Sequence, residues 1–450
     1  MNDASSGSAA SGAGRRVVMV ASGSRGDVQP QAALARGLQA AGWRVRFATH
    51  RCFQPLVEAA GLEFFPLSGD SQGFFSGPAG MALREKLERR DGADWCRRFL
   101  GPFLRKFLAD CAGACAGADA ILYWPPTQVG SSLTEKLGVP SIGVATYPLP
   151  HCRTRAFANP FYSPFSRTVS VSARRLGLEG ALNALSWRFG ETIWADAVRT
   201  EVNRWRVETL GLEPLTPATA RQRVERTPHV LGFSPKVLPV PRDWSEHVHV
   251  SGYWFLDLAT TWMPPREVTD FLAQGPPPVA VGFGSMASRD AAATTEIVLD
   301  ALERAGLRAI FVSGWGGLKQ RALPGSVCLA SDIPHDWLFP RVAAVVHHGG
   351  SGTTAAVLRS GIPHVIVPFG FDQCLWGQRI AELKLGPPPI PHAELTAERL
   401  ASALRVAAAD EAMRASARRF QESLRHEDGV GRAVAVIERY VSGLKPAETR

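Results

Sequence analysis

The sequence predicts an α/β fold built from two doubly wound parallel sheets. Short apolar runs rich in β-branched residues alternate with helical stretches along most of the 450 residues, a pattern typical of parallel sheets covered by helices. The alternation starts a second time at Val279, which indicates a second sheet. Glycine-rich turns follow an early strand and a late one, at 23–27 and 347–354. Ligands of open α/β sheets bind at such turns, at the carboxyl ends of the strands.

Composition narrows the class of protein. An apolar content of 45% and a charged content of 20% are ordinary for a globular chain, and 450 residues predict two or three domains. The net charge of +9 fits nucleic acid, an anionic membrane or an acidic small substrate. Because the arginines are spread widely and no nucleic-acid-binding motif occurs, we expect no nucleic acid partner.

The sequence favours a cytoplasmic location. Residues 1–14 are rich in Ser, Gly and Ala, and we expect a flexible tail there, without the basic start and apolar centre of a signal peptide. No apolar run approaches the ~20 residues that span a bilayer. Seven cysteines lack the spacing of metal ligands, so a reducing compartment is the simplest expectation.

The first domain, expected over 15–235, opens with a βαβ unit. A strand at 17–22, the turn at 23–27, a helix at 28–41 and a strand at 45–49 follow one another. A dinucleotide-binding domain begins in the same way, but two features argue against one. The turn lacks the full G-x-G-x-x-G pattern, and the second strand ends at His50 rather than at an acid for a ribose.

The rest of the chain continues the alternation. Residues 148–175 are rich in aromatic residues, Pro and Arg, and a loop of that length is usually functional. Residues 236–278, rich in Pro and Trp, are expected to cross to a second domain at 279–429. Further strands are expected at 63–66, 120–124, 141–146, 229–233, 279–285, 309–313, 327–330, 342–346 and 364–368, with helices that include 95–116 and 182–210.

The strand at 342–346 leads into two histidines, three glycines and three hydroxyl residues at 347–354, and a helix follows from about 353 to 359. Free N–H groups and the helix dipole at such a turn favour an anion. Asp372 and Gln373 follow the next strand, at the same sheet edge. Phosphate donors beside two sugar-type hydrogen-bonding groups favour a nucleotide sugar. The plainer alternative is a glycine turn followed by an aspartate that caps a helix.

These motifs resemble a known family. HHGGSGTT at 347–354 with FDQ at 371–373 is similar to the donor signature of family-1 (UDP-glycosyltransferase-type) glycosyltransferases, and IPHDWLF at 333–339 resembles the bacterial branch related to sterol and antibiotic glycosyltransferases. The resemblance implies the GT-B fold, in which two Rossmann-like domains face each other across a cleft. It also implies that a final helix at 430–440, within residues 430–450, packs back on the first domain.

The resemblance assigns donor residues. The matching phosphate-binding positions are Ser285, His348, Gly350, Ser351, Gly352, Thr353 and Thr354. Asp372 and Gln373 match an acid–Gln pair that binds the hydroxyls of the donor sugar, which favours glucose. Asp332, Ile333 and Pro334 match the segment against the base, and Trp315 is a second platform or else a core residue. The plant branch of the family has a Trp and an acid near the positions that Asp332 and Ala356 occupy here. Both UDP and dTDP therefore stay open as the nucleotide of the donor.

Asp27 is the candidate catalytic base. It lies in GSRGDVQP at 23–30, which resembles a turn whose aspartate takes the acceptor proton in antibiotic- and sterol-glycosylating relatives. A dry cleft would have to raise its pKa for this role. The alternative is that Asp27 only caps the following helix. Ser24 and Arg25 are further acceptor-side candidates, as are His50 and His151, which are weaker candidates for the base.

These observations predict an inverting glycosyltransferase that moves a hexose, glucose from UDP-glucose, to a hydroxyl of a sterol, lipid or polyketide. No Asp-x-Asp pair occurs, so no essential metal or other cofactor is expected. A UDP-sugar epimerase and a non-catalytic helper of a partner transferase are the alternatives. Segments 83–110 and 148–175 mix basic and aromatic residues, which fits peripheral contact with the inner face of a membrane or a core-facing helix with a solvated basic face.

Overall fold

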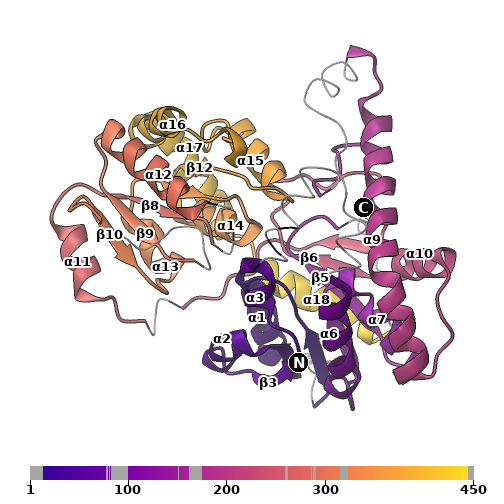
Figure 1. Cartoon of the computed structure of the whole chain (residues 1–450). Helices are drawn as coiled ribbons and strands as arrows, with labels where there is room; N and C mark the ends of the chain where they lie inside the picture. The colour runs from indigo at the N-terminus through magenta and orange to yellow at the C-terminus, as the bar shows by residue number, and fades with distance from the viewer. Residues whose placement is uncertain are drawn as a thin grey trace, which may run out of the picture.

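The computed structural model describes residues 14–77, 80, 82, 100–149, 152–161, 175–258, 262–284, 286, 290–314 and 323–443. Two parallel sheets, each with helices packed around it, form two lobes (Figure 1). This architecture confirms the predicted α/β fold with two parallel-sheet domains.

The first sheet has seven strands in the order β3-β2-β1-β4-β5-β6-β7. Val17 in β1 pairs with Val45 on one side and with Ala120 on the other, and the chain therefore reverses its winding between β1 and β4. The strands are β1 (Arg16–Val20), β2 (Arg44–His50), β3 (Glu63–Leu67), β4 (Ala120–Tyr123), β5 (Ser141–Ala145), β6 (His229–Leu231) and β7 (Val248–Val250).

The second sheet has five strands in the order β10-β9-β8-β11-β12. Its winding reverses between β8 and β11, where Ala280 pairs with Val345. Reversal points are where open α/β sheets bind ligands, and the turns after β1 and β11 leave the sheets there. The strands are β8 (Val279–Gly282), β9 (Ala309–Val312), β10 (Val327–Ala330), β11 (Val345–His347) and β12 (His364–Ile366).

The helices cover both sheets. In the first lobe they are α1 (Arg25–Ala40), α2 (Gln54–Ala59), α3 (Ser71–Ser76), α6 (Gly101–Ala114), α7 (Val129–Leu137), α9 (Glu179–Trp205) and α10 (Pro217–Arg226). In the second lobe they are α11 (Arg266–Ala273), α12 (Ala291–Ala305), α13 (His335–Leu338), α14 (Ser351–Ser360), α15 (Gln373–Glu382), α16 (Ala397–Ala409) and α17 (Glu411–Arg425), and α18 (Gly429–Val441) follows.

Two element predictions need correction. The helix expected from residue 28 begins at Arg25, because Ser24 and Asp27 form a capping box that starts the helix three residues earlier. β7 lies inside 236–278, the range expected to cross between domains. The three residues of β7 pair with β6. Main-chain hydrogen bonds define this strand, which is too short for an apolar pattern to show in the sequence. We propose that the first domain extends at least to Val250.

α18 packs on the first lobe. Its residues Val434 and Ile437 belong to the same hydrophobic core as Val17 of β1 and Leu34 of α1. A Cβ on Gly37 of α1 would clash with Val430, so the two helices approach closely only because residue 37 is a glycine. The chain thus returns to the first lobe after completing the second.

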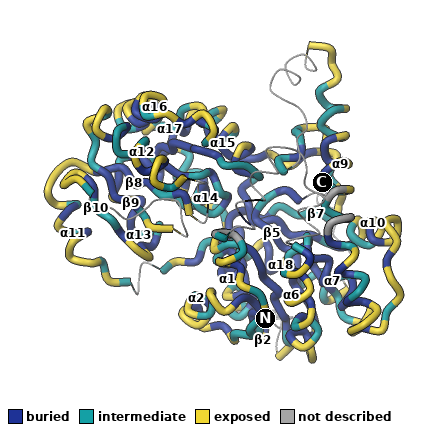
Figure 2. Tube along the Cα trace, in the orientation of Figure 1, coloured by how far each residue is buried: buried dark blue, intermediate teal, exposed yellow. Residues whose placement is uncertain are grey.

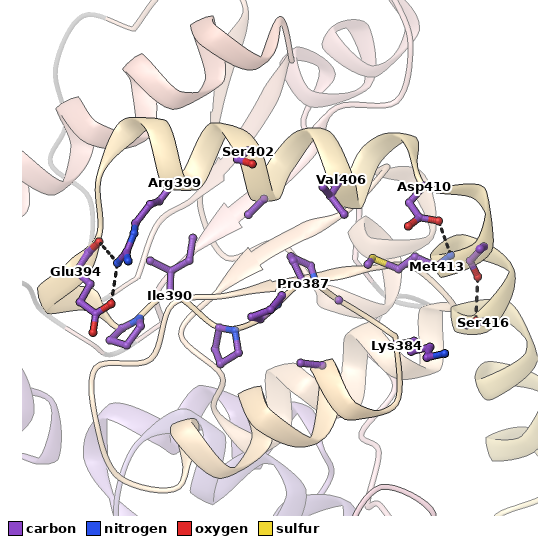
Figure 3. Close-up of a pocket in the computed structure, with 17 residues that line it drawn as sticks. Lys384, Pro387, Ile390, Glu394, Arg399, Ser402, Val406, Asp410, Met413 and Ser416 are labelled. Carbon is purple, nitrogen blue, oxygen red and sulfur yellow. Dashed lines mark hydrogen bonds and ion pairs between the residues drawn. The ribbon is translucent and has the colours of Figure 1, made fainter. Parts of the chain in front are cut away.

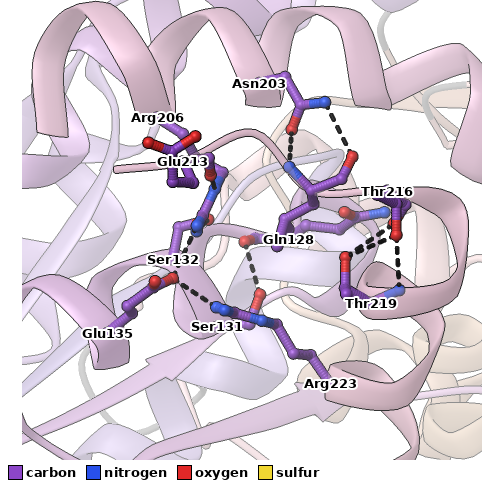
Figure 4. Close-up of polar contacts among 11 residues, drawn as sticks. Gln128, Ser131, Ser132, Glu135, Asn203, Arg206, Glu213, Thr216, Thr219 and Arg223 are labelled. Atoms are coloured by element: carbon purple, nitrogen blue, oxygen red, sulfur yellow. Dashed lines mark hydrogen bonds and ion pairs between the residues drawn. The ribbon is translucent and has the colours of Figure 1, made fainter. Parts of the chain in front are cut away.

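A buried arginine fixes the C-terminal end of α9 to the first lobe (Figure 4). Arg206 is 1% exposed. It donates to Ser132 Oγ at 3.2 Å, to Glu135 Oε2 at 2.7 Å and to the carbonyl oxygen of Glu213 at 2.9 Å. Arg223 of α10 also pairs with Glu135. Two arginines on one carboxylate therefore join α7, α9 and α10.

The two lobes share apolar contacts. Phe233, after β6, packs against Trp376 of α15 with ring centroids 5.7 Å apart, and both rings are fully buried. Leu424 of α17 completes the same hydrophobic cluster. Within the described residues, no helix is both long enough and apolar enough to cross a membrane.

Candidate active site

Asp27 lies at the first reversal point, as the third residue of α1. Its Oδ2 accepts hydrogen bonds from the Ser24 backbone N–H at 2.8 Å and from Ser24 Oγ at 3.0 Å. Gly23 has φ +121°, and a Cβ there would lie 2.5 Å from Oδ2, so glycine makes room for the carboxylate. The helix-capping role considered from the sequence is therefore present, but both of these bonds use only one carboxylate oxygen.

Burial raises the pKa of the Asp27 carboxyl above its ordinary value, and hydrogen bonds from Ser24 and Tyr147 offset part of that rise. Tyr147, two residues after β5, was not among the sequence-predicted site residues. Trp124 Nε1 donates to Tyr147 Oη at 3.0 Å, which leaves the tyrosine hydroxyl proton for another acceptor. A tyrosine between a tryptophan donor and a carboxylate has no short sequence motif, so only the fold could reveal it.

The turn between β11 and α14 forms the opposite side of the site. The His348 ring lies between two glycines: a Cβ on Gly284 would be 2.9 Å from its Cε1, and a Cβ on Gly350 would clash with its Nε2. Among the described residues, His348 Nδ1 is a buried atom without a hydrogen-bond partner. Burial, together with nearby His335, lowers the pKa of His348 to about 4. The imidazole is therefore neutral at pH 7 and can offer one N–H to an anion.

His347 fixes this turn through hydrogen bonds inside the second lobe. It is fully buried, its Nδ1 accepts the Gly349 N–H at 3.1 Å, and its Nε2 lies 3.1 Å from His364 Nδ1 in β12. Burial lowers the pKa of His347 well below its ordinary value and that of His364 to about 3. Of the two adjacent histidines, one holds the turn and the other faces the site.

The N-terminus of α14 meets the first lobe. Ser351 Oγ donates to the carbonyl oxygen of Thr146 at 2.7 Å, and a Cβ on Gly352 would lie 3.7 Å from the carbonyl oxygen of Gly26. The Thr353 residue is half-buried, and Thr354 is buried with no partner for its hydroxyl among the described residues. The predicted phosphate-binding turn thus lies directly against the turn that carries Asp27.

Asp372 and Gln373, at the start of α15, differ in what they face. Asp372 Oδ2 accepts from Trp376 Nε1 at 2.7 Å, and burial raises the pKa of Asp372 to about 7 with a contribution from the charge of Asp27. Gln373 Oε1 accepts the Phe369 N–H at 2.8 Å, and its Nε2 donates to the sulfur of Met286 at 3.2 Å. The Gln373 amide thus holds its own loop together, and its contact with the donor sugar stays a prediction.

The segment expected to contact the base is mostly core. Ile333 is 5% exposed and packs in the second lobe, and Pro334 is buried. Contact of this segment with the base stays a prediction. Asp332 has φ +49° and an exposed side chain. Its carboxylate lies 3.8 Å from the guanidinium of Arg25 in the other lobe.

The remaining candidates divide into two groups. His50 is fully buried; its Nε2 lies 2.8 Å from Ser22 Oγ and its Nδ1 lies 3.1 Å from the carbonyl oxygen of Gly69, so both ring nitrogens are occupied. This geometry speaks against His50 as the base. Ser285, Trp315 and His151 lie outside the described residues.

Two further observations concern other sites. A cavity of about 690 Å³ lies in the second lobe between α15, α16, α17 and the proline-rich loop 386–391 (Figure 3). It contains none of the candidate residues, so it is distinct from the site described above. Among the described residues, no three His, Cys, Asp or Glu side chains gather in a group able to hold a metal ion.

Comparisons with known proteins agree with this fold. Residues 17–158 match the glycosyltransferase family 28 N-terminal domain, and residues 312–428 match the C-terminal domain of erythromycin biosynthesis protein CIII-like proteins. The structure superposes on the calicheamicin glycosyltransferase CalG4 with a TM-score of 0.59, 19% identity and coverage of 96% of this chain and 99% of the other. For glycosyltransferase VinC in complex with dTDP the TM-score is 0.62, with 19% identity and coverage of 95% and 100%. The fold is the GT-B fold of these glycosyltransferases.

The relatives by sequence are more specific. The chain is 37% identical to sterol 3-beta-glucosyltransferase UGT80B1 of Arabidopsis thaliana over 95% of its own length and 68% of that protein. It is 33% identical to the sterol 3-beta-glucosyltransferase of Emericella nidulans over 94% of its length, but spans only 30% of that protein. The chain belongs to the family of the sterol 3-beta-glucosyltransferases. The chain spans about two thirds of the length of the plant sterol 3-beta-glucosyltransferases and less than a third of the length of the fungal enzyme.

Proposed function

We propose that this chain transfers glucose from UDP-glucose to a hydroxyl group of a sterol or a similar apolar alcohol, with inversion at the sugar carbon. One observation carries the proposal: the turn that carries Asp27 and the predicted phosphate-binding turn before α14 meet at Gly26 and Gly352, and Ser351 Oγ beside them donates to the Thr146 carbonyl oxygen of the first lobe. A base and a leaving-group site on opposite lobes are what a single in-line displacement needs. The names of the relatives support glucose and a sterol.

Each group has one role in the proposed step. The acceptor oxygen attacks the anomeric carbon, the bond from that carbon to the diphosphate breaks, and the acceptor proton passes to Asp27. The raised pKa of Asp27 makes the carboxylate a better base than an exposed aspartate. The backbone N–H groups at the start of α14 and the neutral His348 ring stabilise the departing diphosphate. Asp372 holds a hydroxyl of the sugar.

The test is an assay of the purified chain with UDP-glucose and dTDP-glucose against sterols, other lipid alcohols and polyketides, in the presence of EDTA. We expect a glucoside of mass equal to acceptor plus 162 with UDP-glucose, and an anomeric configuration opposite to that of the donor. Retained configuration would contradict the single displacement. Loss of all transfer with EDTA would contradict the assignment of leaving-group stabilisation to α14 and His348.

We further propose that the chain contacts an anionic lipid surface, from which an apolar acceptor is drawn. Figures 1 and 2 show the N-terminal end of α9 projecting from the first lobe with exposed residues. Leu178, Leu185 and Phe189 are 51%, 54% and 49% exposed there and follow helical spacing, while Arg175 and Arg188 beside them are also exposed. An apolar stripe with basic neighbours suits a lipid interface.

Co-sedimentation with vesicles tests this contact. We expect binding to vesicles with anionic lipid, weakened by salt, and at least a threefold loss of binding in Leu185→Asp. Val406→Asp is the matched control, since Val406 is 40% exposed on α16 of the other lobe. Equal binding of both variants would contradict the proposed surface.

A further inference from the structure

Four aromatic side chains form a continuous cluster beside Asp27 that no role in donor binding explains. Trp124 donates to Tyr147, the Tyr147 ring lies 5.4 Å from that of Phe161, and the Phe161 ring lies edge-on to Phe371 at 6.1 Å. All four are only half-buried. They come from the ends of β4 and β5, from the segment after Cys152, and from the loop after β12 of the other lobe. We call Trp124, Tyr147, Phe161 and Phe371 the aromatic cluster.

The outer members of the cluster are not core residues. Neither Phe161 nor Phe371 belongs to a hydrophobic core of the described residues. Phe161 is nevertheless held in place, because its N–H donates at 2.9 Å to Oδ1 of Asn159, a fully buried residue. Asn159 in turn donates its N–H to Ser186 Oγ at 2.8 Å. A half-buried ring on an anchored backbone, outside every hydrophobic core of the described residues, is available for contact with a ligand.

Phe371 adopts a backbone conformation that a bulky residue rarely takes. Its φ is +57°, a left-handed conformation in which the Cβ of a non-glycine residue crowds the backbone. Such strain persists where the surroundings enforce it, and it is concentrated at functional sites. Here it turns the ring toward Phe161 of the opposite lobe, one residue before Asp372. A glycine or asparagine would fit this backbone with less strain.

The charges around the cluster limit what it can hold. Tyr147 lies within electrostatic reach of both Asp27 and Asp372, one carboxylate from each lobe. Two carboxyl groups disfavour an anionic ligand, and the exposed ring faces favour a flat apolar one. A hydroxyl at the end of such a ligand would lie beside the Asp27 carboxylate.

We propose that the aromatic cluster is the acceptor subsite, that it takes neutral, flat, ring-containing alcohols, and that Phe161 determines this specificity. The proposal rests on the glycosyl transfer proposed above and adds the residues that select the acceptor. Tyr147 is a positioning residue within it: Trp124 fixes its hydroxyl, and that hydroxyl holds the carboxylate that receives the acceptor proton.

The test compares two acceptors in the Phe161→Ala variant. With UDP-glucose as donor, we expect KM for a sterol to rise about tenfold, the effect of losing one aromatic contact and its buried area. Turnover of a short linear alcohol and KM for UDP-glucose should stay within twofold of the wild type. Phe161→Trp, which keeps an aromatic face, should retain sterol KM within about threefold. Phe65→Ala, a half-buried phenylalanine on β3, is the matched control and should leave both acceptors unchanged.

Each outcome decides between explanations. If Phe161→Ala lost activity equally with both acceptors, or if its KM for UDP-glucose rose, the Phe161–Phe371 contact would only join the lobes and the proposed subsite would be overturned. An unchanged KM for the sterol in this variant would overturn the subsite as well. A wild-type chain that transfers no sugar to any acceptor would instead contradict the proposed function, so the two failures are distinguishable.

Discussion

At the scale of single residues, Asp27 has the capping role that the sequence offered and a position compatible with its proposed role as the base. One carboxylate oxygen completes the capping box of α1, and the carboxyl group as a whole has a raised pKa beside Tyr147. A cap and a base are compatible here because the cap fixes the carboxylate relative to the turn, which favours a precise position for proton transfer.

Asp27→Asn should lower turnover by about 10²–10⁴, the usual contribution of a general base, while UDP still raises the melting temperature. Thermal unfolding with and without UDP and steady-state turnover check this. Asp410→Asn is the control, because Asp410 also caps a helix, as the N-cap residue of α17 that accepts the Met413 N–H, but lies in the other lobe, away from the candidate site. If both variants lost the same activity, helix capping alone would explain Asp27.

Asp372→Asn should make the donor-free protein more stable at pH 8. The folded-state pKa of Asp372 is raised to about 7, so its stabilising, protonated form is fully present below pH 3.8 and is lost as pH rises toward 7 and beyond. An asparagine keeps an oxygen for Trp376 Nε1 without the charge. Urea unfolding should give a free energy of unfolding for Asp372→Asn that exceeds the wild-type value by a few kcal/mol at pH 8, and this difference should shrink toward pH 4. A variant less stable than wild type at pH 8 would contradict this.

Sequence reasoning placed the two turns of the site correctly on the sheet edges, because glycines and charged residues after apolar strands mark these edges directly. It was less informative about side-chain partners. Gln373 turns back to its own loop, Ile333 packs in the core, and His50 has both nitrogens occupied. Tyr147 was missed because its partners lie far apart in the sequence, Asp27 on α1 after β1 and Trp124 after β4, and their meeting depends on the order of strands in the sheet.

At the scale of elements, periodicity located long helices and buried strands well, since both leave an extended apolar pattern. The structure places α9 over Glu179–Trp205, with a further π-helical turn at Arg206–Leu210, close to the expected 182–210. β7 was missed because three residues are too short for a period to show. The contacts that fix α9 were also invisible in sequence, since Arg206 is buried only by the fold.

Arg206→Met should destabilise the chain by about 2–3 kcal/mol. Removing one partner of a buried ion pair costs about 3–5 kcal/mol, but Glu135 is 34% exposed and keeps Arg223 as a partner, which reduces the loss. Urea unfolding monitored by tryptophan fluorescence measures it. Arg223→Ala, at the half-exposed end of the same network, should cost less than 1 kcal/mol. A loss for Arg223→Ala as large as for Arg206→Met would contradict the assigned burial effect.

At the scale of the whole molecule, burial holds several histidines neutral around the turn between β11 and α14. The pKa values of His348 and His335 are lowered to about 4 and that of His364 to about 3. A group whose folded pKa is lowered contributes stability above its unfolded pKa, near 6.5, and that contribution is lost as pH falls toward the folded value.

The melting temperature of the donor-free chain should therefore fall as pH decreases from about 6.5 to 4. His364→Gln, which keeps a side-chain amide near His347, should show a shallower fall because one buried titrating group has been removed. Scanning calorimetry between pH 7.5 and 4.5 checks both statements. A melting temperature that stays constant between pH 6.5 and 4.5 would show that these rings do not control acid stability.

The return of α18 to the first lobe has a consequence for synthesis on the ribosome. The core around α1 and β1 includes Val434 and Ile437, which are translated after the whole second lobe. Until they emerge, the groove on α1 at Gly37 remains uncovered while the second lobe is being made. The first lobe is thus expected to mature last although it is synthesised first. Expressed alone, it should need α18 supplied as a separate peptide to become resistant to protease.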